Sequence, residues 1–295
     1  MRICGKWRDF EVLDTSDGDK LERWASYTTV RPDPQVIWHG EKRHPAWNNP
    51  TAVYTRSRSG GGGWSVNRLP ESFIIGYGTM KFRIRPTSFK HMGLFPEQAT
   101  NWDLVQKLIR SENREIRVLN LFAYTGGASV ACAAAGAKVC HVDASKGIVA
   151  WAKENAALNG LDSIRFIVDD CLKFVAREQR RGNRYDAVVM DPPSYGRGPG
   201  GEVWKLEDEL EGLVHACVGV MSEDPLFFLL NSYTTGLSAG CMHYILGADV
   251  QARFGGTVRA DEIGLPVKES GLALPCGCTA VWLKDGKENL NELWN

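Results

Sequence analysis

Residues 118–127 read VLNLFAYTGG, an apolar run that ends in a polar turn with two glycines. The run 118–122 is typical of a buried strand, and the small residues of 128–135 predict a helix after it. Because Gly126 and Gly127 lack a Cβ, the turn between strand and helix lets a ligand approach the backbone closely. The stretch therefore predicts a ligand-binding strand–turn–helix unit.

Strands and helices continue to alternate after this unit. Further strands are expected at 138–142, 164–168, 187–190 and 226–230, near Val258 and at 272–283, with helices at 96–110, 145–160, 172–180, 205–220 and 239–250. Alternation of this kind predicts an α/β fold with a doubly wound, mostly parallel, seven-stranded Rossmann-like sheet. Such sheets bind ligands at the carboxyl ends of their strands.

Acidic residues stand at the carboxyl ends of three successive predicted strands. Asp143 follows the second strand, Asp169-Asp170 the third, and Asp191-Pro192-Pro193 the fourth. A single acid in such a place is more often a turn former or a helix cap. Asp143, however, lies 17 positions after Gly126, where a carboxylate can accept both hydroxyls of a ribose. The glycine turn and the acids together indicate a nucleotide-like ligand.

The motif VLNLFAYTGG closely resembles the first motif of class I S-adenosylmethionine-dependent methyltransferases, in a variant similar to the bacterial large-subunit rRNA cytosine-C5 methyltransferase-like family. The resemblance covers about residues 80–290. It implies S-adenosylmethionine as cofactor, with its methionine part against the turn 122–127, its ribose on Asp143 and its adenine amino group near Asp170. It also implies an entry loop at 89–98. The implied cofactor-binding residues are Phe95, Phe122, Ala123, Tyr124, Thr125, Gly126, Asp143, Ala144, Asp170, Cys171 and Asp191.

The chain departs from the C5 enzymes at the nucleophile. Methylation of a pyrimidine C5 needs a thiolate that attacks C6, and the stretch 230–235, LNSYTT, holds no cysteine. Whether Cys276 or Cys278 reaches the site stays open, and two thiols without a second ligand pair predict no metal site.

The turn Asp191-Pro192-Pro193-Ser194-Tyr195 is similar instead to the turn of amino-group methyltransferases, with the aromatic residue one place late. In that turn a carboxylate and a backbone carbonyl position the amine, and an aromatic ring stacks on the base. The expected catalytic residues are Asp191, Pro192, Tyr195 and Tyr233. Ordinary packing is the alternative role of both tyrosines. The glycine-rich stretch 196–205 suits a lid that contacts a nucleic-acid backbone.

The chain divides near residue 85. Residues 1–85 read as a small β-rich domain with strands at 10–13, 27–31, 52–56, 72–77 and 81–84, and residues 86–295 as the catalytic domain. Residues 1–90 carry 15 Lys and Arg against 9 Asp and Glu, and five of the ten tryptophans lie before residue 65. This composition fits an RNA-binding module, and it fits equally a β domain with a tryptophan core and solvated charges.

The whole chain has 295 residues, 43% of them apolar, with balanced charge. It holds no run of 18 apolar residues, and its first residues, MRICGKWRDFEVLD, are too polar for the expectation of a signal peptide. Five of the eight cysteines lie scattered in apolar surroundings, which favours reduced core thiols and a soluble, cytoplasmic protein. We expect a methyltransferase that acts directly on a base of RNA, with ribosomal RNA as the first candidate. The alternatives are methylation of a small molecule or a protein, and a catalytically silent cofactor-binding module. The methylated atom and the oligomeric state stay open.

Overall fold

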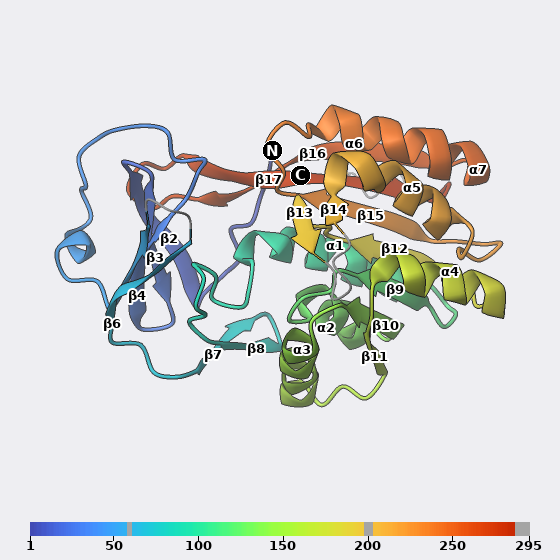
Figure 1. Ribbon diagram of the computed structural model, residues 1–295, viewed down its shortest axis with the longest axis horizontal. Coiled ribbons are helices and arrows are strands. Elements are labelled where there is room, and N and C mark those ends of the chain that lie inside the picture. The colour runs from blue at the N-terminus through green and yellow to red at the C-terminus, as the bar shows by residue number, and fades with distance from the viewer. Residues whose placement is uncertain (58–60, 198–202, 287–295) are drawn as a thin grey trace. The chain divides into compact units, whose positions relative to one another are not determined.

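Figure 1 shows the computed structural model of the protein, which describes residues 1–57, 61–197 and 203–286. The chain forms two compact units. The first comprises Met1, Ile3–Ala99 and Ile263–Cys276, and the second comprises Arg2, Thr100–Glu262 and the residues from Gly277 onward. The division between the units thus falls after Ala99, and the later segment Ile263–Cys276 belongs to the first unit. The expected domain division at residue 85, with an RNA-binding first domain, stays a prediction.

The second unit holds most of an eight-stranded sheet. Its strands, in spatial order, are β1 (Arg2–Ile3), β16 (Thr257–Pro266), β17 (Ala273–Leu283), β15 (Phe227–Ser232), β12 (Ala187–Met190), β9 (Arg117–Leu121), β10 (Lys138–Asp143) and β11 (Ile164–Val168). Neighbours among β15, β12, β9, β10 and β11 pair in parallel, and β17 pairs antiparallel to β15. The predicted mostly parallel sheet is confirmed, with β1 as an additional edge strand.

Helices cover both faces of this sheet. Leu119 and Leu121 of β9 point into a core formed with α4 (Cys171–Arg181), α5 (Leu206–Val218) and α6 (Ala239–Leu246). Asn120 points the opposite way and bonds α2 (Gly127–Ala134) through Ser129. The α1 (Ala99–Arg110) and α3 (Lys146–Leu158) helices pack against that α2 helix. A 3-10 turn, η2 (Pro96–Gln98), precedes α1, and α6 continues through the π-helical turn η3 (Gly247–Gln251) into α7 (Ala252–Phe254).

A short hairpin stands between β12 and α5. It consists of β13 (Tyr195–Arg197) and β14 (Val203–Lys205), which pair antiparallel. The middle of the predicted lid, residues 198–202, lies outside the described residues.

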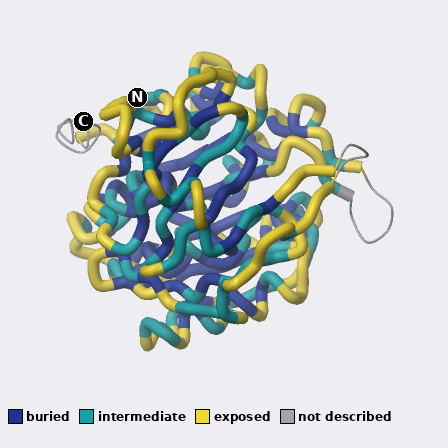
Figure 2. Tube along the Cα trace, turned by 90° about the vertical axis from the view of Figure 1, so that its left-hand side faces the viewer, coloured by how far each residue is buried: buried dark blue, intermediate teal, exposed yellow. Residues whose placement is uncertain are grey.

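The first unit carries a five-stranded sheet and a hairpin. The sheet has the order β2 (Phe10–Ser16), β3 (Asp19–Trp24), β4 (Tyr27–Pro32), β5 (Ala52–Arg56), β6 (Gly62–Asn67), and the hairpin pairs β7 (Phe73–Tyr77) with β8 (Met80–Ile84). A 3-10 turn, η1 (Pro45–Asn48), precedes β5. The strands carry most of the buried residues, and exposed residues gather on loops (Figure 2). The β-rich prediction for this part is confirmed.

The inner strand β3 was not predicted from the sequence because it is strongly charged. Its Glu22 is fully buried, and both carboxylate oxygens accept hydrogen bonds from the guanidinium of Arg31, over 2.7 Å each. A pair of opposite charges on neighbouring strands thus makes a charged segment compatible with the core. The glycine run 60–63 contributes Gly62 and Gly63 to β6. Residues 58–60 lie outside the described residues.

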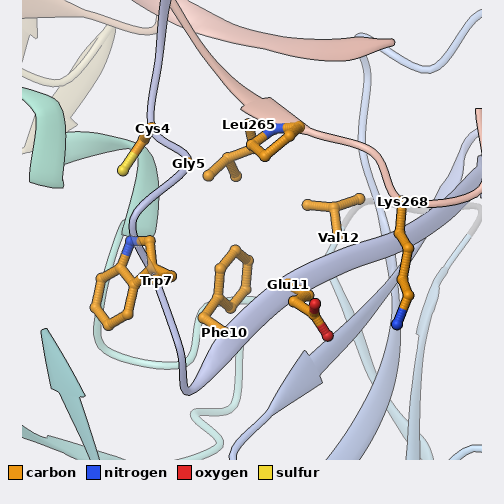
Figure 3. A pocket seen from close by; sticks show the side chains of 9 residues that line it. Cys4, Gly5, Trp7, Phe10, Glu11, Val12, Leu265 and Lys268 are labelled. Atoms are coloured by element: carbon orange, nitrogen blue, oxygen red, sulfur yellow. The ribbon is translucent and has the colours of Figure 1, made fainter. Parts of the chain in front are cut away.

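A cavity of about 210 Å³ lies in the first unit (Figure 3). Cys4 and Trp7 stand at one end of its wall and Lys268 at the other, with Phe10 between them. None of its lining residues is a predicted site residue.

Candidate functional site

The turn after β9 has a strained backbone. Phe122 and Tyr124 have positive φ angles of 52° and 49°, a region that side-chain-bearing residues rarely adopt. Such conformations cost about 1–3 kcal/mol each and persist where surrounding contacts fix them. Here the N–H of Ala123 donates to the Val142 carbonyl over 3.1 Å, and the N–H of Phe122 donates to Cys171 Sγ over 3.4 Å. The turn is therefore held in one shape by the end of β10 and the start of α4.

The two glycines of the turn have packing roles. Gly126 has a φ of 87° and caps the start of α2. A Cβ on Gly126 would lie 3.2 Å from Ala152 Cβ, and one on Gly127 would lie 2.7 Å from Trp102 Cζ2. Both glycines let α2 begin close to its neighbouring helices, in addition to any room that they leave for a ligand.

Asp143 joins two loops at the carboxyl ends of adjacent strands. Its Oδ2 accepts the Tyr124 N–H over 3.0 Å, and its Oδ1 accepts the Ser145 N–H over 2.9 Å. Burial raises the pKa of this carboxyl above its ordinary value, and the two backbone donors lower it. Each carboxylate oxygen has two lone pairs, so each can accept a further hydrogen bond. Asp143 thus has the capacity to bind the two hydroxyls of a ribose, and Ala144 beside it is exposed.

The acids after β11 have local partners. Asp170 caps α4, and its Oδ1 accepts the Lys173 N–H over 2.9 Å. Asp169 pairs with Arg177 and donates its backbone N–H to the Asp143 carbonyl. Helix capping accounts for Asp170 in this structure, and its predicted contact with adenine stays a prediction.

Asp191 follows β12 and is anchored from the neighbouring strand. Its Oδ1 accepts a hydrogen bond from Asn231 Nδ2 over 3.0 Å. Pro192 is buried beside it, and Tyr195 is 52% exposed on β13. Sequence reasoning missed Asn231. Its position near the end of β15, beside a strand that is followed by an acid, is the signal that could have identified it.

Tyr233 lies against β17 where that strand has a glycine. A Cβ on Gly277 would lie 2.9 Å from Tyr233 Cδ1 and 2.7 Å from the Ser232 carbonyl oxygen. Gly277 therefore makes room for the tyrosine ring. In the sequence Cys276-Gly277-Cys278, the informative residue for this site is the glycine.

Trp204 links the first and fourth strand-end turns, and sequence reasoning missed this role. Its ring centroid lies 5.1 Å from that of Phe122, and its Nε1 donates to the Pro193 carbonyl over 2.6 Å. An apolar residue in a glycine-rich stretch gave no signal beyond its size.

The cysteines near these turns are poor nucleophiles. Burial raises the pKa of Cys171, whose sulfur accepts the Phe122 N–H. Burial also raises the pKa values of Cys276 and Cys278, and Cys276 belongs to the first unit. Because the thiolate is the reactive form, raised pKa values oppose covalent catalysis. In the described part of the chain, no three His, Cys, Asp or Glu side chains gather to hold a metal ion.

The structure places most of the predicted site residues in the second unit, at one edge of its parallel sheet. Phe95 is the exception. It belongs to the first unit, where it precedes η2 and its ring lies 5.3 Å from the ring of His91. Its predicted contact with the cofactor stays a prediction.

Residues 54–205, just over half of the chain, match the model of the S-adenosylmethionine-dependent methyltransferase family. The chain belongs to this family. As a member of the family, the protein is a methyltransferase with S-adenosylmethionine as its methyl donor. The turn after β9, Asp143 and Asp191 lie at the carboxyl edge of its parallel sheet. Among solved structures, a SAM-dependent methyltransferase from Agrobacterium tumefaciens is 37% identical, with a TM-score of 0.88 over 94% of this chain and 91% of that one.

More distant relatives agree on the fold. A structure named as a methyltransferase from Streptococcus mutans is 19% identical, with a TM-score of 0.69 over 94% of this chain and 76% of that one. Among curated proteins, the methyltransferase is similar to ribosomal RNA large subunit methyltransferase K/L of Shewanella baltica, 38% identical over 131 residues, and of Pseudoalteromonas atlantica, 43% identical over 117 residues. These matches cover 43% and 39% of this chain but only 17% and 16% of the relatives.

No helix in residues 1–57, 61–197 or 203–286 has both the length and the apolar character needed to cross a membrane.

Proposed function

We propose that this methyltransferase transfers the methyl group of S-adenosylmethionine directly to a base of RNA, with ribosomal RNA as the first candidate. The observation that carries the proposal is Asp191, an acid at the end of β12 whose Oδ1 is held by Asn231. A carboxylate fixed in this way can orient a polar acceptor, which is what direct transfer requires. The partial similarity to curated ribosomal RNA methyltransferases supports RNA as the acceptor.

The cofactor is proposed to lie along the turn Phe122–Gly126. Asp143 would bind the ribose hydroxyls with the lone pairs that Tyr124 and Ser145 leave available. Asp170 would contact the adenine amino group, as the resemblance to the superfamily implies, and Ala144 and Cys171 are proposed as further cofactor-binding residues. Phe95 would contact the cofactor from the loop that precedes η2.

The acceptor is proposed to be an amino nitrogen rather than a pyrimidine C5. Asp191 and the backbone carbonyl of Pro192 would accept the hydrogens of the amine and so direct the nitrogen lone pair toward the methyl group. The exposed ring of Tyr195 and the half-buried ring of Tyr233 offer stacking faces for a base. The raised pKa values of Cys171, Cys276 and Cys278 argue against the thiolate that C5 chemistry needs.

The first unit is proposed to add RNA affinity through its excess of basic residues. Arg56 is exposed on β5, whereas Arg68 donates to the Pro50 carbonyl over 2.7 Å. Arg58, a third basic residue of this part of the chain, lies outside the described residues. Neutralised phosphates release counterions, so RNA affinity should fall steeply with salt. Arg56→Glu should weaken RNA binding and flatten this salt dependence, and unchanged binding would remove the unit from the proposal.

Methyl labelling of RNA tests the function. Ribosomal RNA from a strain that lacks the gene is incubated with the protein and tritiated S-adenosylmethionine, and the labelled nucleoside is then identified. We expect a single modified base, absent with RNA from the parent strain. Label in the metabolite or protein fraction instead would favour the alternative substrates. Tight cofactor binding without transfer to any fraction would favour a silent module.

A further inference from the structure

Asp191 ends a line of four hydrogen bonds that runs through the interior of the second unit. Asn231 Nδ2 donates to Asp191 Oδ1 over 3.0 Å, and Thr279 Oγ1 donates to Asn231 Oδ1 over 2.7 Å. Asn101 Nδ2 donates to Thr279 Oγ1 over 3.0 Å, and Arg2 Nη1 donates to Asn101 Oδ1 over 2.7 Å. The four residues behind Asp191 are buried, at no more than 3% exposure. They come from β15, β17, α1 and β1.

The chemistry of the two ends fixes the direction of this line. A guanidinium can only donate hydrogen bonds, and an ionised carboxylate can only accept them. Each group between Arg2 and Asp191 must therefore accept from the arginine side and donate toward the acid. Hydrogen bonds that point the same way polarise one another, most strongly where water is excluded.

We propose that Arg2, Asn101, Thr279 and Asn231 form a positioning relay that holds the Asp191 carboxylate in the orientation used for methyl transfer. The inference rests on the proposed role of Asp191 at the acceptor. Asn231 acts directly on the acid, and the three residues behind it act through Asn231. None of the four contacts the acceptor in this account, so each is a positioning residue.

Buried polar groups need partners in any fold, so a purely structural network is the competing explanation. A relay and a purely structural network differ in what they require of Thr279, which lies two hydrogen bonds away from Asp191. Thr279→Val keeps the shape of the side chain but removes its hydroxyl, and Thr279→Ser keeps the hydroxyl. The relay requires the hydroxyl, whereas packing requires the methyl group.

The matched variants are compared by three measurements. The first is NMR of the ¹⁵N-labelled protein, in which the Asn231 side-chain amide signals are assigned by their loss in Asn231→Asp. The second is methyl transfer to RNA from the deletion strain, and the third is calorimetric S-adenosylmethionine binding. We expect Thr279→Val to shift the Asn231 amide signals and to lower kcat roughly three- to tenfold, the effect of losing about one net hydrogen bond. KM and cofactor affinity should stay unchanged, and Thr279→Ser should retain the wild-type values.

Unchanged Asn231 signals in Thr279→Val would overturn the relay, and so would equal kcat losses in the Val and Ser variants. If Thr279→Val fails to fold, Asn101→Asp replaces it, because aspartate keeps the acceptor for Arg2 and loses the donor to Thr279. The NMR measurement needs no acceptor. Shifted signals in a protein that methylates no RNA would therefore support the coupling of Thr279 to Asn231 while refuting the proposed function, and unchanged signals would overturn the relay whatever the acceptor.

Discussion

The backbone N–H of Tyr124 donates to Oδ2 of Asp143 over 3.0 Å and so ties the strained turn after β9 to the acid that ends β10. The carboxylate of Asp143 therefore serves the shape of the turn and is also available to a ligand. Substitution of Asp143 should therefore weaken cofactor binding in two ways, by loosening the turn and by removing an acceptor for the ligand. Substitutions that differ in these two effects are informative.

Asp143→Ala should weaken S-adenosylmethionine binding by about 1.5–3 kcal/mol, the scale of losing charge-assisted hydrogen bonds. Asp143→Asn, which keeps one oxygen acceptor and a similar shape, should lose less. Titration calorimetry with both variants checks the assignment. Wild-type affinity in Asp143→Ala would show that the ribose is bound elsewhere.

Asp191→Ala should lower turnover by a factor of roughly 10²–10³ while the affinity for S-adenosylmethionine stays near that of the wild type, as expected for a group that orients the acceptor. Single-turnover methyl transfer measures the change in turnover, and calorimetry measures the affinity for S-adenosylmethionine. Asp169→Asn, at another strand-end acid, is a matched control that should keep turnover. A variant that loses cofactor affinity and turnover together would place Asp191 at the cofactor instead.

Cys276→Ser and Cys278→Ser should each retain turnover, because burial raises the pKa values of both thiols and disfavours the reactive thiolate. RNA that contains 5-fluorocytosine should accordingly form no stable adduct with the wild type, as judged by denaturing electrophoresis. An adduct that disappears in either serine variant would make the protein a C5 methyltransferase.

The sheet and two of its acids could be predicted because their signals are local. Apolar runs such as Ala187–Met190 are buried throughout, and acids that follow such runs stand at the ligand-binding edge of a parallel sheet. Asp143 and Asp191 were found in this way. Their placement at that edge follows from the parallel pairing of β9, β10 and β12.

The other features of the site and of the fold could not be predicted, because most of them depend on contacts between residues far apart in sequence. Asn231 gains its role only beside Asp191, 40 positions earlier, and Trp204 gains its role only against Phe122. The positive φ of Phe122 and Tyr124 runs against the local preference of both residue types, so propensity predicts an ordinary turn. In the first unit, β3 is a strand because Arg31 on β4 neutralises its buried Glu22.

That Glu22–Arg31 pair supports a prediction about stability. Burial by itself raises the pKa of Glu22, but the charges of Arg31 and Lys20 outweigh this effect and lower the pKa from 4.5 to about 2. Its contribution to stability is therefore fully present above pH 4.5, the unfolded value, and is lost as the pH falls toward 2. Glu22→Gln should cost about 3–5 kcal/mol near neutral pH, because Arg31 is left buried without its partner.

The pair Glu11–Arg23, on β2 and β3 of the same sheet, is the matched control. Its N–O distance is 2.8 Å, close to that of the buried pair, but its side chains are 37% and 28% exposed. Glu11→Gln should therefore change the free energy of unfolding by only about 0–1 kcal/mol. Urea denaturation of both variants between pH 2 and pH 7 measures the difference. The loss caused by Glu22→Gln should shrink below pH 4.5, since the wild type itself loses this contribution as Glu22 becomes protonated. Equal losses in the two variants, or a Glu22→Gln loss that does not change with pH, would contradict the stabilising role assigned to the buried charges.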